Sequence, residues 1–218
     1  MAVRAVIFDM DGVLVQSEEL WDAAREALVR ERGGRWHEGA TRDMMGMSSR
    51  EWSRYIHEEL GVDMTPEEIN DEVVRRLEAS YREHLPLIDG APEAVERLAA
   101  RWPLGLASSA NRPLIELALD LSGLDRYFRA TVSSEEVERG KPAPDVYLEA
   151  ARRLEVDPQS CAAIEDSTNG LRSAKAAGMR VIAIPNPAFP PADEALALAD
   201  AVAESLRAVT PELVGGGS

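Results

Sequence analysis

The chain has 218 residues, 45% hydrophobic and 29% charged, and can bury a core of one or two domains. Its 39 acidic residues exceed its 24 lysines and arginines, leaving a formal net charge of −15. This charge excludes nucleic acid and anionic membranes as main partners. The single cysteine, Cys161, excludes an internal disulfide and fits a reducing compartment. Without a secretory or membrane-spanning apolar run, the sequence predicts a cytoplasmic protein, a monomer in preference to a dimer.

Short apolar runs alternate with helical patterns along most of the chain. Strands are predicted over 3–8, 104–108, 130–132, 161–164 and 180–184. Helices are predicted over 143–154, begun by flanking prolines, and over 167–177, with Ser167 as N-cap and Gly178 as the stop. Unbroken apolar strands between helices favour a parallel sheet covered on both faces. We therefore predict a doubly wound α/β core.

Only helical patterns occur between the first two strands. Residues 17–32 carry one apolar stripe, and 65–68 has capping-box spacing with Pro66 at the first helical position. A ligand of an open α/β sheet binds at the carboxyl ends of the strands, so a helical insertion there would cover the site. We predict a core of residues 1–15 and 86–218 and an all-helical cap of residues 16–85.

Two carboxylates follow the first strand. Asp9 and Asp11 are two residues apart, and Gly12 then permits an unusual backbone geometry. Both side chains reach the same space beyond the sheet edge, where a hard divalent cation would relieve their repulsion. For so short a pattern, a solvated acidic turn is an equal alternative.

Three further polar segments each lie at the end of a predicted strand or in the loop that follows. Residues 107–111 offer hydroxyl and backbone N–H groups to a phosphate, Lys141 is fixed between prolines, and Glu165 and Asp166 form a second acidic pair. Each segment alone is also explained as a helix cap or an ordinary surface group. Their joint placement favours a site for a phosphate and a metal ion.

These segments resemble the motifs of the haloacid dehalogenase superfamily. The matches are DxDGV at 9–13, ASS at 107–109, GKPAPD at 140–145 and EDS at 165–167. The resemblance covers essentially the whole chain, and lies with the phosphatase and β-phosphoglucomutase-like branch that has a helical cap. It implies a Rossmann-like core with sheet order 3-2-1-4-5.

The resemblance also implies catalytic roles. Asp9 would be the nucleophile that forms an aspartyl-phosphate, and Asp11 the general acid and then the base. Ser108 and Lys141 would hold the transferring phosphoryl group. Mg²⁺ would be bound by Asp166, a carboxylate oxygen of Asp9 and the backbone carbonyl of Asp11. Glu165 would lie beside the ion as a direct or indirect contributor.

The predicted substrate-binding residues come from both parts of the chain. Ser109 and Asn111 follow the second strand, whereas Trp21 lies in the first cap helix. Gly46 and Arg50 belong to residues 44–50, which resemble the specificity loop of the family's cap. Packing inside the cap is the alternative explanation for Trp21, and a plain surface position is the alternative for Arg50.

The resemblance implies a Mg²⁺-dependent phosphomonoesterase acting on a small phosphorylated metabolite, either a sugar or a polyol phosphate. Asp11 argues against a true dehalogenase, because a halide leaving group needs no proton donor. Trp21 occupies the position where β-phosphoglucomutases carry a histidine. This difference argues against a phosphomutase but does not exclude one. A non-catalytic phosphometabolite-binding protein is the third alternative.

Overall fold

The computed structural model describes residues 2–44 and 47–216, and within them six strands form one parallel sheet in the order β3-β2-β1-β4-β5-β6. The strands are β1 Ala5–Phe8, β2 Leu104–Ser108, β3 Phe128–Ser133, β4 Cys161–Glu165, β5 Arg180–Ala183 and β6 Ala201–Val202. The predicted α/β class and strand order are confirmed, and β6 is an addition at the edge of β5. A strand of two residues is too short to produce a periodic pattern, so the sequence did not indicate it.

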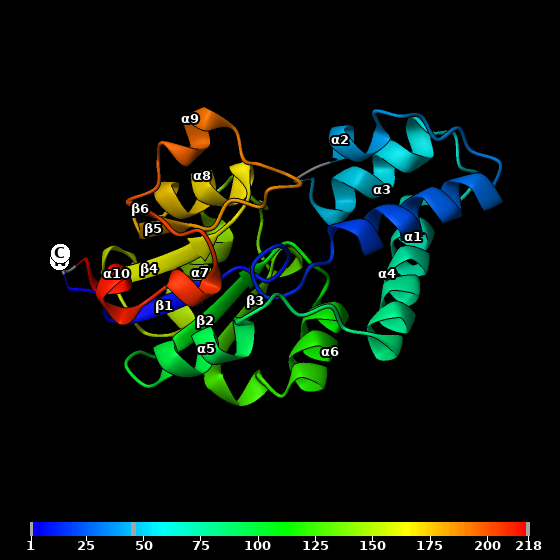
Figure 1. Cartoon of the computed structure of the whole chain (residues 1–218). Coiled ribbons are helices and arrows are strands. Elements are labelled where there is room, and N and C mark those ends of the chain that lie inside the picture. Colours follow the sequence, from blue (N-terminus) through cyan, green and yellow to red (C-terminus); the bar gives the residue numbers. More distant parts are fainter. Residues whose placement is uncertain (1, 45–46, 217–218) are drawn as a thin grey trace.

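The helices alternate with the strands except in one long insertion after β1 (Figure 1). The α-helices are α1 Glu18–Glu31, α2 Ala40–Met44, α3 Ser49–Glu58, α4 Pro66–Glu83, α5 Ala91–Ala99, α6 Arg112–Ser122, α7 Asp145–Arg153, α8 Thr168–Ala176, α9 Asp193–Leu196 and α10 Pro211–Gly215. Short 3₁₀ turns are η1 Asp125–Tyr127, η2 Ser134–Glu136, η3 Pro158–Ser160 and η4 Leu206–Ala208.

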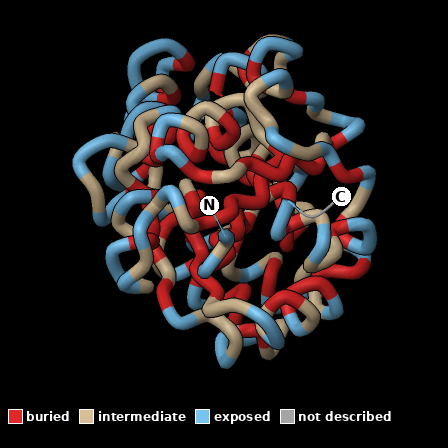
Figure 2. The backbone as a smooth tube through the Cα atoms, turned by 90° about the vertical axis from the view of Figure 1, so that its left-hand side faces the viewer, coloured by how far each residue is buried: buried red, intermediate tan, exposed pale blue. Residues whose placement is uncertain are grey.

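Both faces of the sheet are buried, as β1 illustrates. Val6 and Phe8 belong to the apolar cluster that includes α5 and α6, whereas Ala5 and Ile7 belong to the cluster that includes α7 and α8. Successive side chains of a strand point to opposite faces, so an unbroken apolar strand fits only between two helical layers. Figure 2 shows the resulting pattern, with buried segments through the middle of the molecule and exposed segments around them.

The helices α1, α2, α3 and α4 lie together to one side of the sheet (Figure 1). Helix α4 begins with the predicted capping box: the Thr65 hydroxyl accepts from the Glu68 N–H, and the Glu68 carboxylate accepts from the Thr65 N–H. The segments entering and leaving this insertion pair with each other, since Ile88 N donates to Leu14 O at 2.9 Å and Gln16 N donates to Pro86 O at 2.8 Å. The predicted boundary between cap and core falls at this pairing.

Candidate active site

Strand direction brings the predicted catalytic side chains to one edge of the sheet. Asp9 directly follows β1, Ser108 ends β2, and Glu165 ends β4. These strands are neighbours and run parallel, so their carboxyl ends meet. Lys141 comes from the loop between η2 and α7 and contacts two of them. Residues separated by more than 150 positions in the sequence thus form one site.

Lys141 is the central cation of this site. Its Nζ lies 2.9 Å from Asp9 Oδ1 and 2.6 Å from Glu165 Oε1, and its side chain is 4% exposed. Burial acts to lower the pKa of Lys141, but the charges of Asp9 and Glu165 overcome it and raise that pKa above its usual value. The ammonium group therefore stays charged, next to the carboxylate predicted to act as nucleophile.

Glu165 is fully buried and accepts hydrogen bonds with both oxygens. Oε1 accepts from the Tyr147 hydroxyl at 2.8 Å in addition to Lys141. Oε2 accepts from the N–H of Asp166 at 3.1 Å and from the N–H and hydroxyl of Ser167 at 3.3 and 3.2 Å. A Cβ on Gly170 would lie 1.9 Å from this carboxylate, so only glycine fits there. These contacts fix the position of Lys141.

A carboxylate cluster beside Lys141 fits a divalent cation. One oxygen each of Asp9, Glu165 and Asp166 lies within 4.8 Å of the others, and all three residues are buried. Asp166 Oδ1 is buried without a hydrogen-bond partner among the described residues. Gly12, at φ +75°, lets Asp166 approach, because a Cβ there would lie 1.9 Å from Asp166 Oδ2. Mg²⁺ prefers oxygen ligands, and a bound ion would supply the partner that the buried Asp166 carboxylate lacks.

Crowding and burial shift the protonation of these carboxyls. Burial raises the pKa of Asp9 to about 8, against the lowering effect of Lys141. Burial likewise raises the pKa of Asp166 well above its usual value, and the charge of Glu165 adds to this. Without a bound cation, Asp9 and Asp166 therefore retain protons up to a higher pH than a free aspartate, whose pKa is 3.8.

Asp11 is held separately from the metal cluster. The Ser17 hydroxyl donates a short hydrogen bond to Oδ1, and Ser108 Oγ donates to Oδ2 at 3.4 Å. Burial raises the pKa of Asp11, whereas hydrogen bonds from Ser17 and Trp21 act to lower it. A buried carboxyl with a raised pKa suits a general acid. Ser17 precedes α1 but makes no side-chain cap there, so its role at Asp11 was not visible in the sequence.

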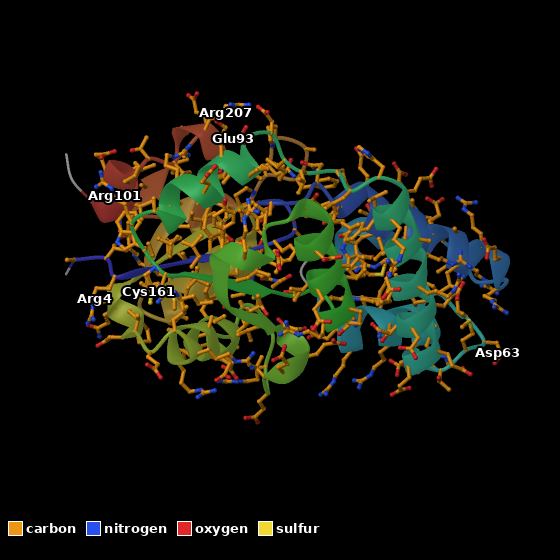
Figure 3. The ribbon with its side chains drawn as sticks, turned by 90° about the horizontal axis from the view of Figure 1, so that it is seen from below. Arg4, Asp63, Glu93, Arg101, Cys161 and Arg207 are labelled. Carbon is orange, nitrogen blue, oxygen red and sulfur yellow. The ribbon has the colours of Figure 1, made fainter. Side chains whose placement is uncertain are left out.

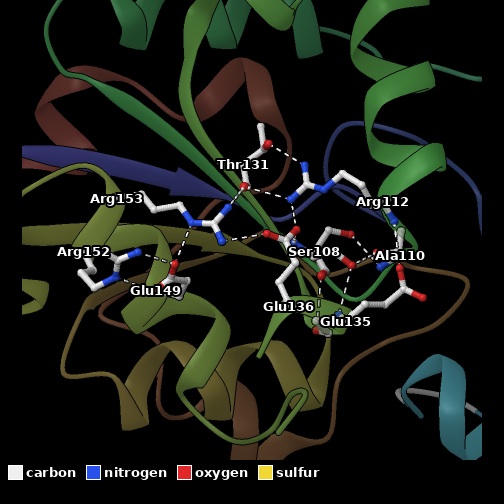
Figure 4. Close-up of polar contacts among 11 residues, drawn as sticks. Ser108, Ala110, Arg112, Thr131, Glu135, Glu136, Glu149, Arg152 and Arg153 are labelled. Atoms are coloured by element: carbon white, nitrogen blue, oxygen red, sulfur yellow. Dashed lines mark hydrogen bonds and ion pairs between the residues drawn. The ribbon is translucent and has the colours of Figure 1, made fainter. Parts of the chain in front are cut away.

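Ser108 lies at the junction of two networks. Its Oγ accepts from the Ala110 N–H at 3.0 Å while it faces Asp11, and its backbone carbonyl accepts from Ser134. Figure 4 shows Ser108 and Ala110 next to a chain of ion pairs in which Glu136 joins Arg112 and Arg153. This network ties β3 to α6 and α7, and therefore keeps the end of β2 in place.

Residues of the predicted cap (residues 16–85) and loops of the predicted core enclose a cavity of about 410 Å³ above these groups. Asp9, Asp11, Lys141 and Asp166 line its floor, and Ser109 lies beside them. Its remaining lining comes from the cap residues Glu18, Trp21, Asp22, Arg25, Thr41, Met44, Met47 and Trp52, and from the core residues Ala110, 167–169 and 189–191. The predicted positions of Trp21 and Ser109 therefore lie at this cavity.

Sequence reasoning missed several lining residues, of which Arg25 and Trp52 are the most prominent. The Arg25 guanidinium lies 4.7 Å from the ring centroids of both Trp21 and Trp52. The two rings themselves meet edge to face at 5.9 Å. Arg25 follows Trp21 by four positions, so a helical projection from Trp21 would have found it. Trp52 comes from α3, which only the tertiary structure places nearby.

Two predicted substrate-binding residues, Arg50 and Asn111, do not line this cavity. Arg50 lines a second cavity of about 380 Å³, together with residues of α3 and α4 and with Glu135. Asn111 is buried, and its Nδ2 donates to Asn70 at 3.0 Å and to Glu135 at 2.6 Å, which links the core to α4. Gly46 lies outside the described residues. Substrate contact by these residues stays a prediction.

Cys161 lies at the opposite, amino-terminal edge of the sheet. It begins β4, and Figure 3 shows it near Arg4, far from Asp63 in the loop between α3 and α4. Burial raises the pKa of its thiol to about 11. A buried, protonated thiol at that edge is a small apolar core residue.

Among the described residues, none of the helices has the length and apolar character needed to cross a membrane.

Comparison with known proteins agrees with this geometry. The family model for haloacid dehalogenase-like hydrolases matches residues 3–178. Hexitol phosphatase B of Escherichia coli K12 is 34% identical over 95% of both chains. The phosphorylated carbohydrates phosphatase of Thermotoga maritima is 34% identical over 83% of this chain and 84% of its own. CbbY from Rhodobacter sphaeroides, solved with phosphate, superposes with a TM-score of 0.83 at 28% identity, over 94% of this chain and 95% of its own.

The chain belongs to the haloacid dehalogenase-like hydrolase family. Within it, the chain falls in the branch of sugar-phosphate phosphatases and β-phosphoglucomutase-like proteins, and the prediction of a phosphatase of this family is confirmed.

Proposed function

We propose that this protein is a Mg²⁺-dependent phosphomonoesterase that hydrolyses a small phosphorylated sugar or polyol through an aspartyl-phosphate. The observation that carries the proposal is the contact of Lys141 with both Asp9 and Glu165, beside the unsatisfied carboxylate of Asp166 and at the floor of a cavity. The relatives named for hexitol and carbohydrate phosphates support a substrate of that class.

The metal would be held by Asp9 and Asp166, with the backbone carbonyl of Asp11, and Glu165 beside it. Bound there, Mg²⁺ supplies positive charge that lets an anionic nucleophile approach an anionic ester. Glu165 already accepts five hydrogen bonds, so we assign it the positioning of Lys141 in preference to a direct metal bond.

The first chemical step is attack by a carboxylate oxygen of Asp9 on phosphorus. The P–O bond to the substrate breaks, and its alcohol oxygen takes the proton of Asp11. Negative charge spreads over the equatorial phosphoryl oxygens, where Lys141 and the Ser108 hydroxyl stabilise it. Asp11 reaches the leaving oxygen because Ser17 and Ser108 hold it clear of the metal cluster.

The second step restores the enzyme. Asp11, now ionised, removes a proton from water, whose oxygen attacks the phosphorus of the aspartyl-phosphate. The acyl phosphate P–O bond breaks, Asp9 regains its carboxylate, and inorganic phosphate leaves. Residues 16–85, which we propose as the cap, cover this site and limit the entry of bulk water.

Trp21 supports hydrolysis over phosphate transfer within a sugar. It acts to lower the pKa of Asp11 and packs against Trp52, and an indole N–H can only donate. A histidine there could exchange protons with the substrate, whereas Trp21 cannot.

Phosphate release from sugar, polyol and aryl phosphates tests the proposal, with and without EDTA. We expect release that requires Mg²⁺ and that Asp9→Asn abolishes. Hydrolysis that survives EDTA or Asp9→Asn would contradict it. Interconversion of glucose phosphates without release of phosphate would favour the mutase.

A further inference from the structure

Arg25 of α1 is a second cation of the active-site cavity, and it comes from the cap. It lies one helical turn after Trp21, and both residues line the cavity whose floor contains Asp9 and Lys141. Its guanidinium is 4.7 Å from the centroids of Trp21 and of Trp52. Two indole rings therefore fix the plane of the guanidinium, as aromatic rings do when arginine stacks on them.

One N–H group of Arg25 has no partner among the described residues. Its Nε is buried without a hydrogen-bond partner, and no ion pair joins Arg25 to another described residue. Asp22 and Asp11 act on it electrostatically, and Asp22 receives a hydrogen bond from Thr41. Burial lowers the pKa of Arg25 to about 10, which still leaves it charged at neutral pH. Arg25 is half-buried, and its buried Nε–H lacks an acceptor, which an anion in the cavity would supply.

Lys141 makes the contrast clear. Its ammonium group forms ion pairs with Asp9 and Glu165. The charge of Lys141 is therefore already balanced, at the floor of the cavity where we propose that phosphoryl transfer takes place. Arg25 projects from the cap side and lacks such a pair. The part of a substrate that meets it is the leaving portion. A guanidinium presents planar, paired N–H donors, a geometry that matches a carboxylate or a phosphate.

We propose that Arg25 binds an anionic group, a carboxylate or a second phosphate, on the leaving portion of the substrate. The preferred substrates are then phosphorylated sugar acids or sugar bisphosphates, in preference to neutral sugar or polyol phosphates. This inference rests on the phosphatase function proposed above and narrows its substrate class.

Two matched substrate pairs test the proposal with the full-length Mg²⁺-loaded protein. Gluconate and glucitol, each phosphorylated on the oxygen of C6, differ at C1 by a carboxylate against a hydroxymethyl group. Fructose bisphosphate and fructose monophosphate differ by the second phosphate. We expect wild type to have a kcat/KM about tenfold or more higher for the anionic member of at least one pair, and the pair that responds identifies the anion.

Arg25→Met keeps the apolar stem of the side chain and removes the charge. We expect it to lower kcat/KM for the preferred anionic substrate about 30-fold or more, and to change the neutral member by no more than about threefold. Arg25→Lys restores the charge without the planar fork, so it should recover part of the loss and covers the case in which Arg25→Met folds poorly. Arg30→Met is the matched control, since Arg30 lies in the same helix, is exposed and pairs with Glu26.

Two results overturn the inference while the phosphatase function stands. One is a wild-type enzyme that hydrolyses an aryl phosphate with Mg²⁺ but does not distinguish the members of either pair. The other is an equal effect of Arg25→Met on charged and neutral members. If wild type releases phosphate from no ester at all, the proposed function itself fails.

Discussion

Two sides of the cavity differ in how their charged side chains are held. The floor consists of the side chains at the ends of the strands, and the roof consists of the cavity-lining residues of α1 and α3, namely Trp21, Arg25 and Trp52. On the floor, Lys141 and Glu165 are buried and bonded to several partners each, so their positions are over-determined by the fold. On the roof, Arg25 is held by ring contacts with Trp21 and Trp52, and its Nε has no hydrogen-bond partner. The difference indicates that the fold fixes the predicted catalytic side chains through many bonds, whereas Arg25, in the proposed cap, keeps one N–H donor free for the substrate that we propose.

The largest effect is expected on the floor, from Asp9→Asn. The substitution preserves shape and removes the nucleophile, so phosphate release should fall about 10³-fold or more. Asp63→Asn makes the same chemical change at an exposed loop position of the cap and should leave the rate unchanged. If the two variants retained similar activity, Asp9 would not be the nucleophile.

Gly170→Ala tests whether the position of Glu165 is as tightly fixed as its hydrogen bonds indicate. Alanine is the better helix former by about 1 kcal/mol, so by propensity alone the variant would be more stable. Its Cβ, however, would lie 1.9 Å from the Glu165 carboxylate, which must move and take Lys141 with it. We expect a lower melting temperature and a kcat reduced about 10- to 100-fold.

A wild-type melting temperature and kcat for Gly170→Ala would show that the loop after β4 adapts. Gly123→Ala is a useful comparison, because Gly123 also lies at a helix end but has open space around it; its φ of +67° alone should lower stability, without a loss of kcat.

Mg²⁺ should stabilise the protein more as the pH rises. The pKa of Asp9 is 3.8 as a free carboxyl and about 8 in the folded protein, so the folded state keeps a proton that the unfolded state has lost. This contribution makes stability fall as the pH increases between these two values. A cation that replaces the proton recovers the loss, and a concentration of one hundred times Kd contributes about 2.7 kcal/mol.

Melting temperatures measured across this pH range, with excess Mg²⁺ and with EDTA, check the expectation. The two curves should diverge as the pH rises, and Asp166→Asn should bring them together. A gain in melting temperature that is equal at all pH values would argue against a metal site at these carboxylates.

The smallest expected effect concerns the contact between cap and core. Asn111 Nδ2 donates to Asn70 of α4 at 3.0 Å, and Asn70→Ala removes this acceptor. We expect a loss of about 1 kcal/mol in the free energy of unfolding, measured by urea denaturation, with kcat retained. Glu67→Ala, an exposed neighbour on α4, serves as the control. A large loss of kcat would mean that the positions of the predicted catalytic side chains depend on the hydrogen bond between Asn111 and Asn70.

Much of the floor could be predicted because it depends on short segments at strand ends. Asp9, Ser108 and Glu165 each follow an apolar run, and parallel strands place their ends together. The capping box at Thr65 likewise predicted the start of α4, whereas the strand order came from the resemblance of the motifs to a known family. The cavity-lining residues of α1 and α3 were harder to predict from the sequence, since the helices of residues 16–85 can pack in several ways that local patterns do not distinguish.

By itself the sequence determined the fold class and the residue types that converge at the sheet edge, because these depend on periodicity, turns and chain direction; the strand order was implied by the family resemblance of the motifs. Only the tertiary structure decided that Trp52 lies against Trp21 and Arg25, that Ser17 bonds Asp11 in place of capping α1, and that Arg50 lines a different cavity. These contacts join residues from separate helices or loops. They arise from three-dimensional packing, which has no local signature in the chain.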